Sequence, residues 1–236
     1  DLVVYYRDPL EIISIDDEIK FYDQWTEDID HDGIKEVCEF ERKPLEVLFR
    51  IKGSNIIFLV ILVASKSKGV FSVSDLINHQ FLALANRKRL LAQSKKIRKR
   101  IDQLMSQQPN LPLIIMGDFN DEPGMDSYEK LLGASSIETI MGSVFDPDKI
   151  LHNTLWYLSK TDKRVDLWTT EYPDLIVKNF GYHKAWLDHI FISRNLLTES
   201  GKFRYIRNSG KIIPKDLDAK NVSDHFAIYC KFKVET

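Results

Sequence analysis

A carboxylate and a carboxamide follow directly after a strongly apolar stretch near the middle of the chain. Leu113 to Met116 are apolar and rich in β-branching, which predicts a buried strand that Gly117 ends. Asp118 and Asn120 lie two residues apart, so an extended backbone presents both on the same side. Such a carboxylate can orient or deprotonate water or hold a divalent metal, and the amide can donate to a phosphoryl oxygen without adding charge. The same residues also fit an Asx-rich turn after a core strand.

An acidic residue and an Asp-His pair occur in two later apolar stretches. Asp224 and His225 open an alternating stretch that predicts a strand over 226–232, and Asp188 lies inside the apolar stretch 186–193. A lone carboxylate in so apolar a strand is costly unless it is paired, and the imidazole of His225 is its natural partner. Asp188 would accept a hydrogen bond from His225, fix its tautomer and raise its basicity. Asp224 can supply a metal ligand beside this pair.

The rest of the sequence predicts the elements that position these groups. Ile56 to Val63 form a continuous apolar run, which predicts a strand buried on both faces, and 75–105 carries apolar residues at helical spacing. Alternation of strands and helices predicts the α/β class. The other predicted elements are strands over 2–6 and 10–15, a strand pair over 35–51 broken at Lys43-Pro44, a short helix over 126–133, an aromatic-rich loop region over 142–185, and a hairpin with a loop over 200–220.

Two charged stretches are ambiguous from the sequence alone. Asp28, Asp30 and Asp32 alternate as at the start of a calcium loop, but Glu36 comes too early for that pattern, so we favour an exposed hairpin tip. The basic residues of 75–105 would form either a solvated face or a patch for nucleic acid or an anionic membrane. We favour the solvated face.

Composition narrows the class of protein. The chain has 236 residues, enough for one large domain over 1–236, and its 44% hydrophobic and 29% charged residues are typical of a soluble globular protein. The formal net charge of −2 provides no global basic field for nucleic acid, so binding there needs a local patch. Cys38 and Cys230 lie in strand-like contexts and predict buried thiols. No apolar run is long enough to span a bilayer; we expect a monomer, and the compartment stays open.

The motifs described above occur in the order of a known family. Gly117-Asp118-Phe119-Asn120, Leu187-Asp188-His189-Ile190-Phe191 and Ser223-Asp224-His225 together resemble the endonuclease/exonuclease/phosphatase superfamily, the deoxyribonuclease I-like group. The segment 40–45 is similar to the family's Arg-x-Pro strand pair, and 60–68 to its strand ending in His-Leu-Lys-Ser-Lys. The resemblance implies a four-layer α/β sandwich, in which two packed mixed β-sheets are flanked by helices and the active cleft lies at one end.

The resemblance also implies a chemistry for these residues. Family members are metal-dependent hydrolases of phosphate esters that attack phosphorus with water in line. By this likeness, Asp118 would orient or activate the water and Asn120 would steady the phosphoryl oxygens. Asp224 would bind Mg²⁺ or Mn²⁺, and His225, held by Asp188, would bind the scissile phosphate or exchange a proton.

The chain departs from the family pattern at two places. Ala64 stands where the family usually has a histidine or a tyrosine that binds or protonates the phosphate or leaving group. Losing a general acid commonly costs about 100- to 10,000-fold in rate. The family's opening asparagine and metal-binding glutamate have no counterpart, because the chain begins at 1–7 with what resembles a later strand. Either the metal site is degenerate or the sequence lacks the first strands of the domain, and the abrupt start favours the second explanation.

Three functions compete on these observations. The first is a phosphodiesterase or nuclease with nucleic acid as its substrate; Arg42, at the break before Pro44, would contact a substrate phosphate or be an ordinary surface arginine. The second is a phosphatase for inositol phosphates, phosphoinositides or other phospholipids. The third is a catalytically silent domain that binds a partner, which Ala64 and the absent glutamate favour. The retained acidic residues and histidine favour a hydrolase.

Overall fold

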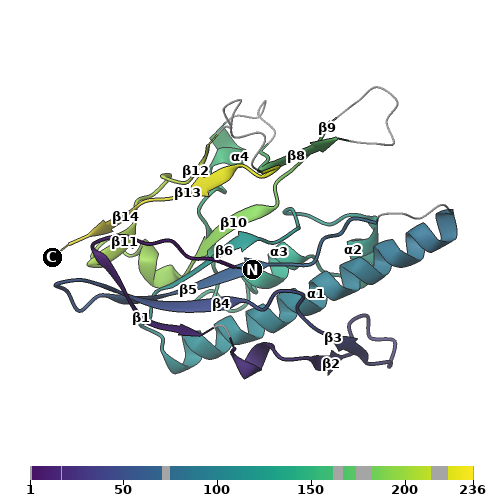
Figure 1. Cartoon of the computed structure of the whole chain (residues 1–236), viewed down its shortest axis with the longest axis horizontal. Coiled ribbons are helices and arrows are strands. Elements are labelled where there is room, and N and C mark those ends of the chain that lie inside the picture. Colours follow the sequence, from purple (N-terminus) through teal and green to yellow (C-terminus); the bar gives the residue numbers. More distant parts are fainter. Residues whose placement is uncertain are drawn as a thin grey trace.

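A six-stranded mixed sheet forms the centre of the computed structural model, which describes residues 2–16, 18–70, 75–161, 167–173, 182–213 and 223–235 (Figure 1). Neighbouring strands pair in the order β1-β4-β5-β6-β10-β7. Only the pairing of β5 with β6 is parallel among these strands. The strands are β1 (Leu10–Asp16), β4 (Leu45–Ile51), β5 (Ile57–Ala64), β6 (Leu113–Asp118), β10 (Asp188–Ile192) and β7 (His152–Asn153).

A long helix makes the crossover that the parallel β5–β6 pair requires. This helix, α1 (Leu76–Gln107), begins after Asp75, whose side chain accepts a hydrogen bond from the backbone amide of Asn78. The short helices α2 (Ser127–Leu132) and α3 (Ser136–Met141) follow β6. All three predicted features, the buried strand at 56–63, the long helix and the short helix at 126–133, are confirmed. Within the described residues, no helix combines the length and apolarity that a membrane span needs.

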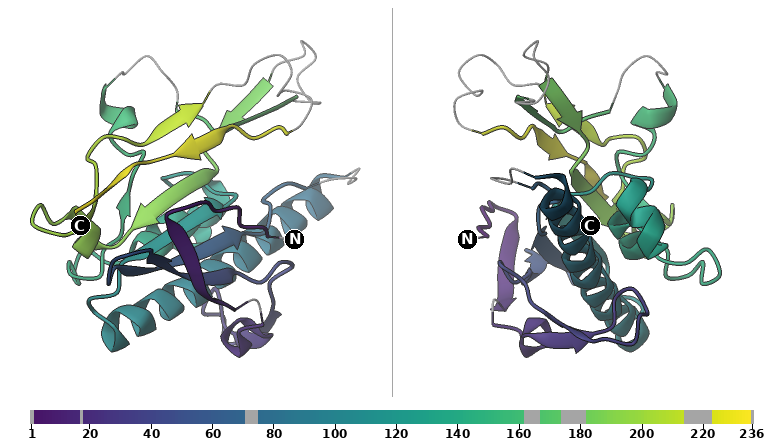
Figure 2. Two further views of the ribbon diagram at one scale, coloured as in Figure 1. Left: turned by 60° about the vertical axis from the view of Figure 1, so that its left-hand side comes forward. Right: turned by 90° about the vertical axis from the view of Figure 1, so that its right-hand side faces the viewer.

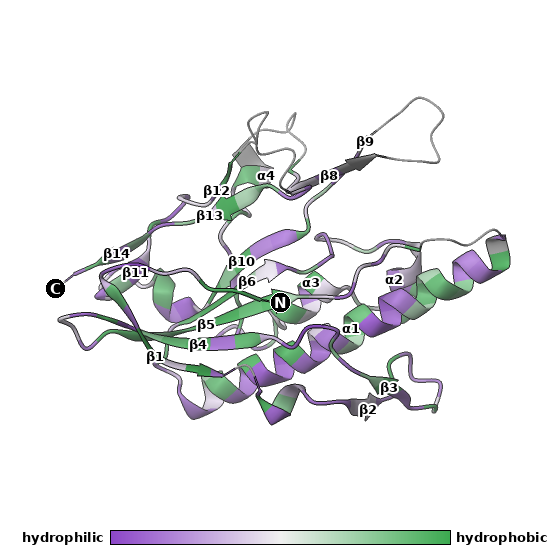
Figure 3. Cartoon of the chain, in the orientation of Figure 1, coloured by the Kyte–Doolittle hydropathy of each residue, from purple (hydrophilic) through white to green (hydrophobic). Residues whose placement is uncertain are grey.

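Two hydrophobic clusters cover the two faces of the central sheet. Alternate residues of β5 and β6, such as Ile61 and Ile115, pack against α1 and α3 through Ile97, Ile101 and Ile137. The intervening residues face a second set of short strands. Figure 3 shows the apolar character of β5 and the mixed character of β4 and α1. Period-two alternation in buried strands therefore explains both core layers.

The second set of strands lies on the face of the sheet opposite α1 (Figure 2). Its side chains Phe203, Tyr205 and Phe232 complete the cluster on that face. The layers confirm the predicted α/β sandwich of packed sheets with flanking helices. These strands are β11 (Phe203–Tyr205) paired with β14 (Phe232–Val234), and β12 (Lys211–Ile213) paired with β13 (Ala227–Tyr229). The remaining elements are η1 (Lys20–Tyr22), β2 (Trp25–Glu27), β3 (Glu36–Cys38), α4 (Leu158–Thr161), β8 (Thr170–Pro173), β9 (Tyr182–Ala185) and η2 (Arg194–Leu197).

Three expectations about strand pairing are wrong. Residues 2–6 are not a regular strand, although Leu2 and Val4 pack on the sheet. The two strands within 35–51 do not pair with each other, because β3 pairs with β2 while β4 pairs with β1 and β5. The described part of the predicted hairpin, 200–213, does not pair with itself, because β11 and β12 each pair with a strand near the end of the chain. Contacts between distant aromatic residues, such as Phe203 and Phe232 with centroids 5.2 Å apart, favour these pairings.

The basic residues of α1 form the favoured solvated face only in part: Arg89 and Lys99 are exposed, whereas four others pair with acidic side chains. Arg87 pairs with Asp126, Lys88 with Asp30 and Glu36, Arg98 with Asp102, and Arg100 with Glu46. These side chains are half-buried, and their charges attach neighbouring elements to the helix. They are therefore not available as one continuous patch for nucleic acid.

The acidic stretch forms the predicted hairpin tip between β2 and β3. Asp28, Asp30 and Glu36 come close enough to share a cation. The ammonium group of Lys88 already contacts Asp30 at 2.6 Å and Glu36 at 2.8 Å. The expected thiols are also confirmed, because Cys38 and Cys230 are both free, the first buried and the second half-buried.

Replacing Gly117 by alanine should destabilise the fold by at least about 2 kcal/mol. Gly117 has φ +141°, and a Cβ there would lie 2.0 Å from the carbonyl oxygen of Val63 in β5. Gly53 is a matched control, because it also has positive φ (+73°) but a Cβ there would meet nothing within 4 Å. Its replacement should cost about 1 kcal/mol. Urea unfolding followed by circular dichroism measures both, and equal losses would contradict the close approach of β5 and β6.

Candidate active site

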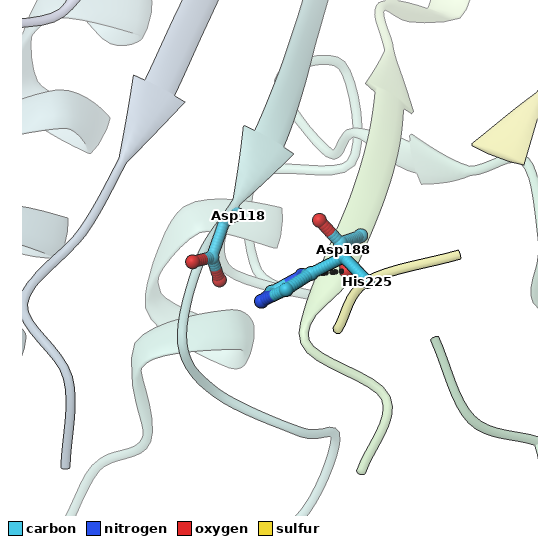
Figure 4. Close-up of side chains that lie close together, drawn as sticks. All are labelled: Asp118, Asp188 and His225. Carbon is cyan, nitrogen blue, oxygen red and sulfur yellow. Dashed lines mark hydrogen bonds and ion pairs between the residues drawn. The ribbon is translucent and has the colours of Figure 1, made fainter. Parts of the chain in front are cut away.

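Three polar side chains converge where β6 ends and β10 begins (Figure 4). Asp118 and Asp188 are directly paired in the antiparallel register of these strands. His225 comes from the segment before β13 and forms a bridge with Thr170. Asp118, Asp188 and His225 each offer a ligand atom, and these atoms all lie within 4.8 Å of one another.

The hydrogen bond predicted between Asp188 and His225 is present. Nδ1 of His225 lies 2.8 Å from Oδ2 of Asp188, and the two side chains are 29% and 14% exposed. The hydrogen bond to Asp188 raises the pKa of His225 above its usual value, although burial opposes this. With Nδ1–H donating to Asp188, Nε2 is left to face a reacting group. The dyad is thus formed as the sequence predicted, while its catalytic role stays a prediction.

Asp118 is held by the residue two positions after it. The backbone amide of Asn120 donates to Oδ1 of Asp118, and its side-chain amide donates to Oδ2, both at 2.8 Å. Burial raises the pKa of Asp118 to about 6, while the Asn120 amide and the charges of His225 and Arg42 oppose this rise and Asp188 adds to it. Asp118 and Asn120 therefore lie side by side, as expected. The Asn120 amide also donates to the carbonyl oxygen of Ser65 at 2.9 Å, so donating to a phosphoryl oxygen requires it to exchange one of these bonds.

The other two predicted site residues lie at the margin. The side chain of Asp224 is exposed and is not a member of the close group, while its backbone oxygen accepts from the side chain of Thr170 at 3.1 Å. Its role as a metal ligand stays a prediction. Arg42 is exposed on the loop between β3 and β4, and its charge is close enough to act on Asp118. Arg42 is therefore placed to attract an anionic group toward the site.

The close group has the donors of a divalent metal site. Two carboxylates and one imidazole suit Mn²⁺, and carboxylates also bind Mg²⁺. Asp188 already uses one oxygen to accept from His225, so its other oxygen remains for a metal. The residues present therefore fit the metal that the family resemblance implies.

Ala64 lies beside Asp118 in the sheet. The parallel register of β5 and β6 pairs the two residues directly, so their side chains point to the same face. Ala64 is half-buried and presents only a methyl group. The position where the resembling family usually has a histidine or tyrosine is thus adjacent to Asp118, and the methyl group of Ala64 cannot exchange a proton.

A buried threonine that the sequence did not single out joins the two halves of the dyad. Oγ1 of Thr169 accepts from the backbone amides of Leu187 and Asp188 at 3.0 and 2.9 Å. The backbone oxygen of Thr169 accepts from the amide of Phe226, next to His225, at 2.6 Å. Thr169 therefore fixes the segment of Asp188 relative to that of His225. A threonine in a loop carries no local signal for such a role.

His189 stabilises the loop that follows Asp118 from the buried side. It is fully buried, Nε2 donates to the carbonyl oxygen of Asp121 at 3.0 Å, and Nδ1 accepts from the side-chain amide of Asn153 at 2.9 Å. Burial lowers its pKa to about 4. His189 is therefore a neutral structural residue, and its two hydrogen bonds support the loop that follows Asp118.

Comparisons with known proteins agree with this fold. A sequence model of the Endonuclease/Exonuclease/phosphatase family matches residues 82–231. No curated protein sequence matches the chain at a significant level. Similar solved structures include an endonuclease/exonuclease/phosphatase from Bacteroides vulgatus (TM-score 0.51, 15% identity, covering 98% of this chain and 69% of that one) and truncated TDP2 from Caenorhabditis elegans (0.50, 12%, 96% and 68%). TDP2 from D. rerio, complexed with single strand DNA product, has a TM-score of 0.49 at 13% identity over 96% of this chain and 69% of that one. At these identities the likeness shows the fold alone.

Lowering the pH should reduce the free energy of unfolding through His189. Its pKa is lower in the folded state than in the unfolded state, so its contribution is complete above pH 6.5 and is lost as the pH falls toward 4. Between pH 7 and pH 5 this loss amounts to about 2 kcal/mol. Urea unfolding at both pH values in EDTA, on the wild type and on His189→Gln, isolates the effect.

The variant should lose about 2 kcal/mol less than the wild type between these pH values. Because Asp118 and His225 titrate in both proteins, their contributions cancel in the difference. The same pH dependence in the two proteins would show that His189 is not held neutral by burial.

Proposed function

The chain belongs to the endonuclease/exonuclease/phosphatase family, and on that premise we propose that it is a metal-dependent phosphoric ester hydrolase, most simply a phosphodiesterase acting on nucleic acid. The observation that carries the proposal is the close group of Asp118, Asp188 and His225, whose ligand atoms lie within 4.8 Å of one another. The proposal takes 1–236 as one domain, supported by a core cluster that includes both Leu2 and Phe232.

Asp118 orients the attacking water in this mechanism. Its pKa of about 6 leaves the carboxylate mostly ionised at neutral pH, yet close enough to neutrality to accept a proton from water. The two hydrogen bonds from Asn120 hold the carboxylate in one orientation. Preorganisation of this kind lowers the cost of reaching the in-line geometry.

His225 acts on the phosphate from the other side of the group. Asp188 holds its Nδ1 proton at 2.8 Å, so Nε2 is directed to the reacting centre. A raised pKa keeps the imidazole protonated over a wider range, which favours contact with an anionic phosphoryl oxygen. Arg42 adds a second positive charge at the rim.

Asp118 and the free oxygen of Asp188 would hold the metal, with Asp224 as a further ligand from the same segment as His225. A bound Mg²⁺ or Mn²⁺ would neutralise the negative charge that develops on the phosphoryl oxygens and the leaving group. Asp118 and Asp188 fix the position of such a cation, because the two residues are directly paired in the adjacent strands β6 and β10.

A silent binding domain is the second candidate, and Ala64 is the observation that favours it. Ala64 is adjacent to Asp118 and cannot supply a proton. A weakened hydrolase and a silent domain therefore share the same site geometry. They differ in whether restoring an imidazole restores turnover. A phosphatase for phosphoinositides or phospholipids would use the same group on a different substrate.

Replacing Asp118 by asparagine should lower turnover of bis-p-nitrophenyl phosphate at least about 100-fold in Mn²⁺ or Mg²⁺. The melting temperature should fall only modestly, because the amide oxygen still accepts from the Asn120 backbone and only the bond from the Asn120 side chain is lost. Asp146→Asn, at an exposed carboxylate paired with Lys149, is the matched control and should leave turnover unchanged. Equal turnover in all three proteins would remove Asp118 from the mechanism.

Replacing Ala64 by histidine should raise turnover at least about tenfold, because it places a proton donor beside Asp118. Ala64→Phe controls for the bulk of a ring without a titratable proton. A folded Ala64→His protein that hydrolyses the substrate no faster than Ala64→Phe would favour the silent domain. The assay uses the same substrate and metals as above.

A further inference from the structure

A buried cluster of charges lies behind the loop that carries Asp118 and Asn120. Lys68, four residues after the end of β5, contacts Asp121 and Glu129, the latter at 2.6 Å. The side chain of Asp121 is fully buried, that of Glu129 is 4% exposed and that of Lys68 is 20% exposed. Two carboxylates so deeply buried are costly unless a cation compensates them. Lys68 is the cation that contacts both.

Asp121 also accepts hydrogen bonds from other parts of the chain. Its Oδ2 accepts from the backbone amides of Ser136 and Ile137 at 2.8 and 3.1 Å, and Oδ1 accepts from the amide of Glu122 at 2.8 Å. Its backbone oxygen accepts from Nε2 of His189 at 3.0 Å. Asp121 is therefore the point at which the loop is attached to α3 and to β10.

The segment 65–68, which follows β5, contacts the loop 118–121 near both ends of that loop. Ser65 accepts from the side chain of Asn120 at 2.9 Å, and its amide donates to the backbone oxygen of Asp118 at 2.9 Å. Three residues later, Lys68 reaches Asp121. Only two residues separate Asp118 from Asp121, so a displacement of Asp121 must move Asn120 and its bonds to Asp118.

We propose that Lys68 is a positioning residue for the hydrolytic reaction: its ammonium group holds the carboxylate of Asp121 and thereby keeps Asp118 and Asn120 in their places. The role rests on the proposed function, because it assigns a task to a residue that touches neither substrate nor metal. The mechanical part, in which Lys68 restrains the loop, stands on the contacts alone.

Four variants separate positioning from general stability. Lys68→Met removes the charge, and Lys68→Arg retains it. Asp121→Asn breaks the same contact from the other side while keeping an oxygen for the amides of α3. Arg100→Met is the matched control, because Arg100 makes a bidentate pair at 2.8 and 2.9 Å with Glu46, whose side chain is 6% exposed.

Amide hydrogen exchange over 117–122 is the first measurement, and it needs no activity. The amides of Phe119 and Asn120 bond to Leu187 and Asp118 in the native loop. Both should exchange at least tenfold faster in Lys68→Met and Asp121→Asn than in the wild type. They should stay within threefold of the wild type in Lys68→Arg and Arg100→Met. Should Lys68→Met fail to fold, Asp121→Asn and Lys68→Arg supply the same comparison.

Kinetics with bis-p-nitrophenyl phosphate and Mn²⁺ form the second measurement. Lys68→Met and Asp121→Asn should lower kcat at least tenfold with KM within threefold, and Lys68→Arg should recover most of the loss. Arg100→Met should lower the melting temperature while leaving kcat unchanged. Loss of melting temperature in Lys68→Met without a change in exchange or kcat would overturn the proposal. No turnover in the wild type would overturn the proposed hydrolase and its positioning role, while exchange would still decide whether Lys68 restrains the loop.

Discussion

The pairing of β6 on both of its edges is the constraint on which the rest of the structure depends. The parallel register with β5 places Ala64 beside Asp118, and the antiparallel register with β10 places Asp188 on the other side. These three residues form one row across the sheet, with their side chains on one face. A shift of one residue in either register would point the side chain of Asp118 or Asp188 toward the apolar core. The apolar residues on both sides of β6 therefore fix the position of the chemistry as well as the fold.

The same face of the sheet changes from buried to open along β6. Ile114 is 6% exposed and belongs to the cluster under the second set of strands, whereas Met116 is 36% exposed and Asp118 follows it at the strand end. The second layer thus covers one end of this face and leaves the other accessible to a substrate. Asp118 lies at the edge of the covered region. It is buried enough there for its pKa to be raised, and it is still in contact with solvent.

Polar side chains that interrupt strongly apolar strands were predictable, including one long-range pair, whereas contacts made by loop residues were not. Asp118, Asn120 and the Asp188–His225 pair were identified because short polar motifs interrupt strongly apolar strands. Thr169 and the Lys68–Asp121 contact were missed because a threonine or lysine in a loop has no pattern that names its partner. The same reason explains why β11 was expected to pair locally, whereas it pairs with β14 almost thirty residues later. Asp224 is adjacent to His225 in sequence, but its side chain is exposed and lies outside the close group, so its role as a metal ligand stays a prediction.

The most direct test of the account is to locate Mn²⁺ on the protein by paramagnetic broadening of its amide NMR signals. If Asp118, Asp188 and His225 form a metal-dependent hydrolytic site, substoichiometric Mn²⁺ should broaden the signals of these residues first, and excess Mg²⁺ should reverse the effect. Broadening centred on Asp28, Asp30 and Glu36, or no localised broadening at all, would contradict the assignment of the metal to the row across β6 and β10.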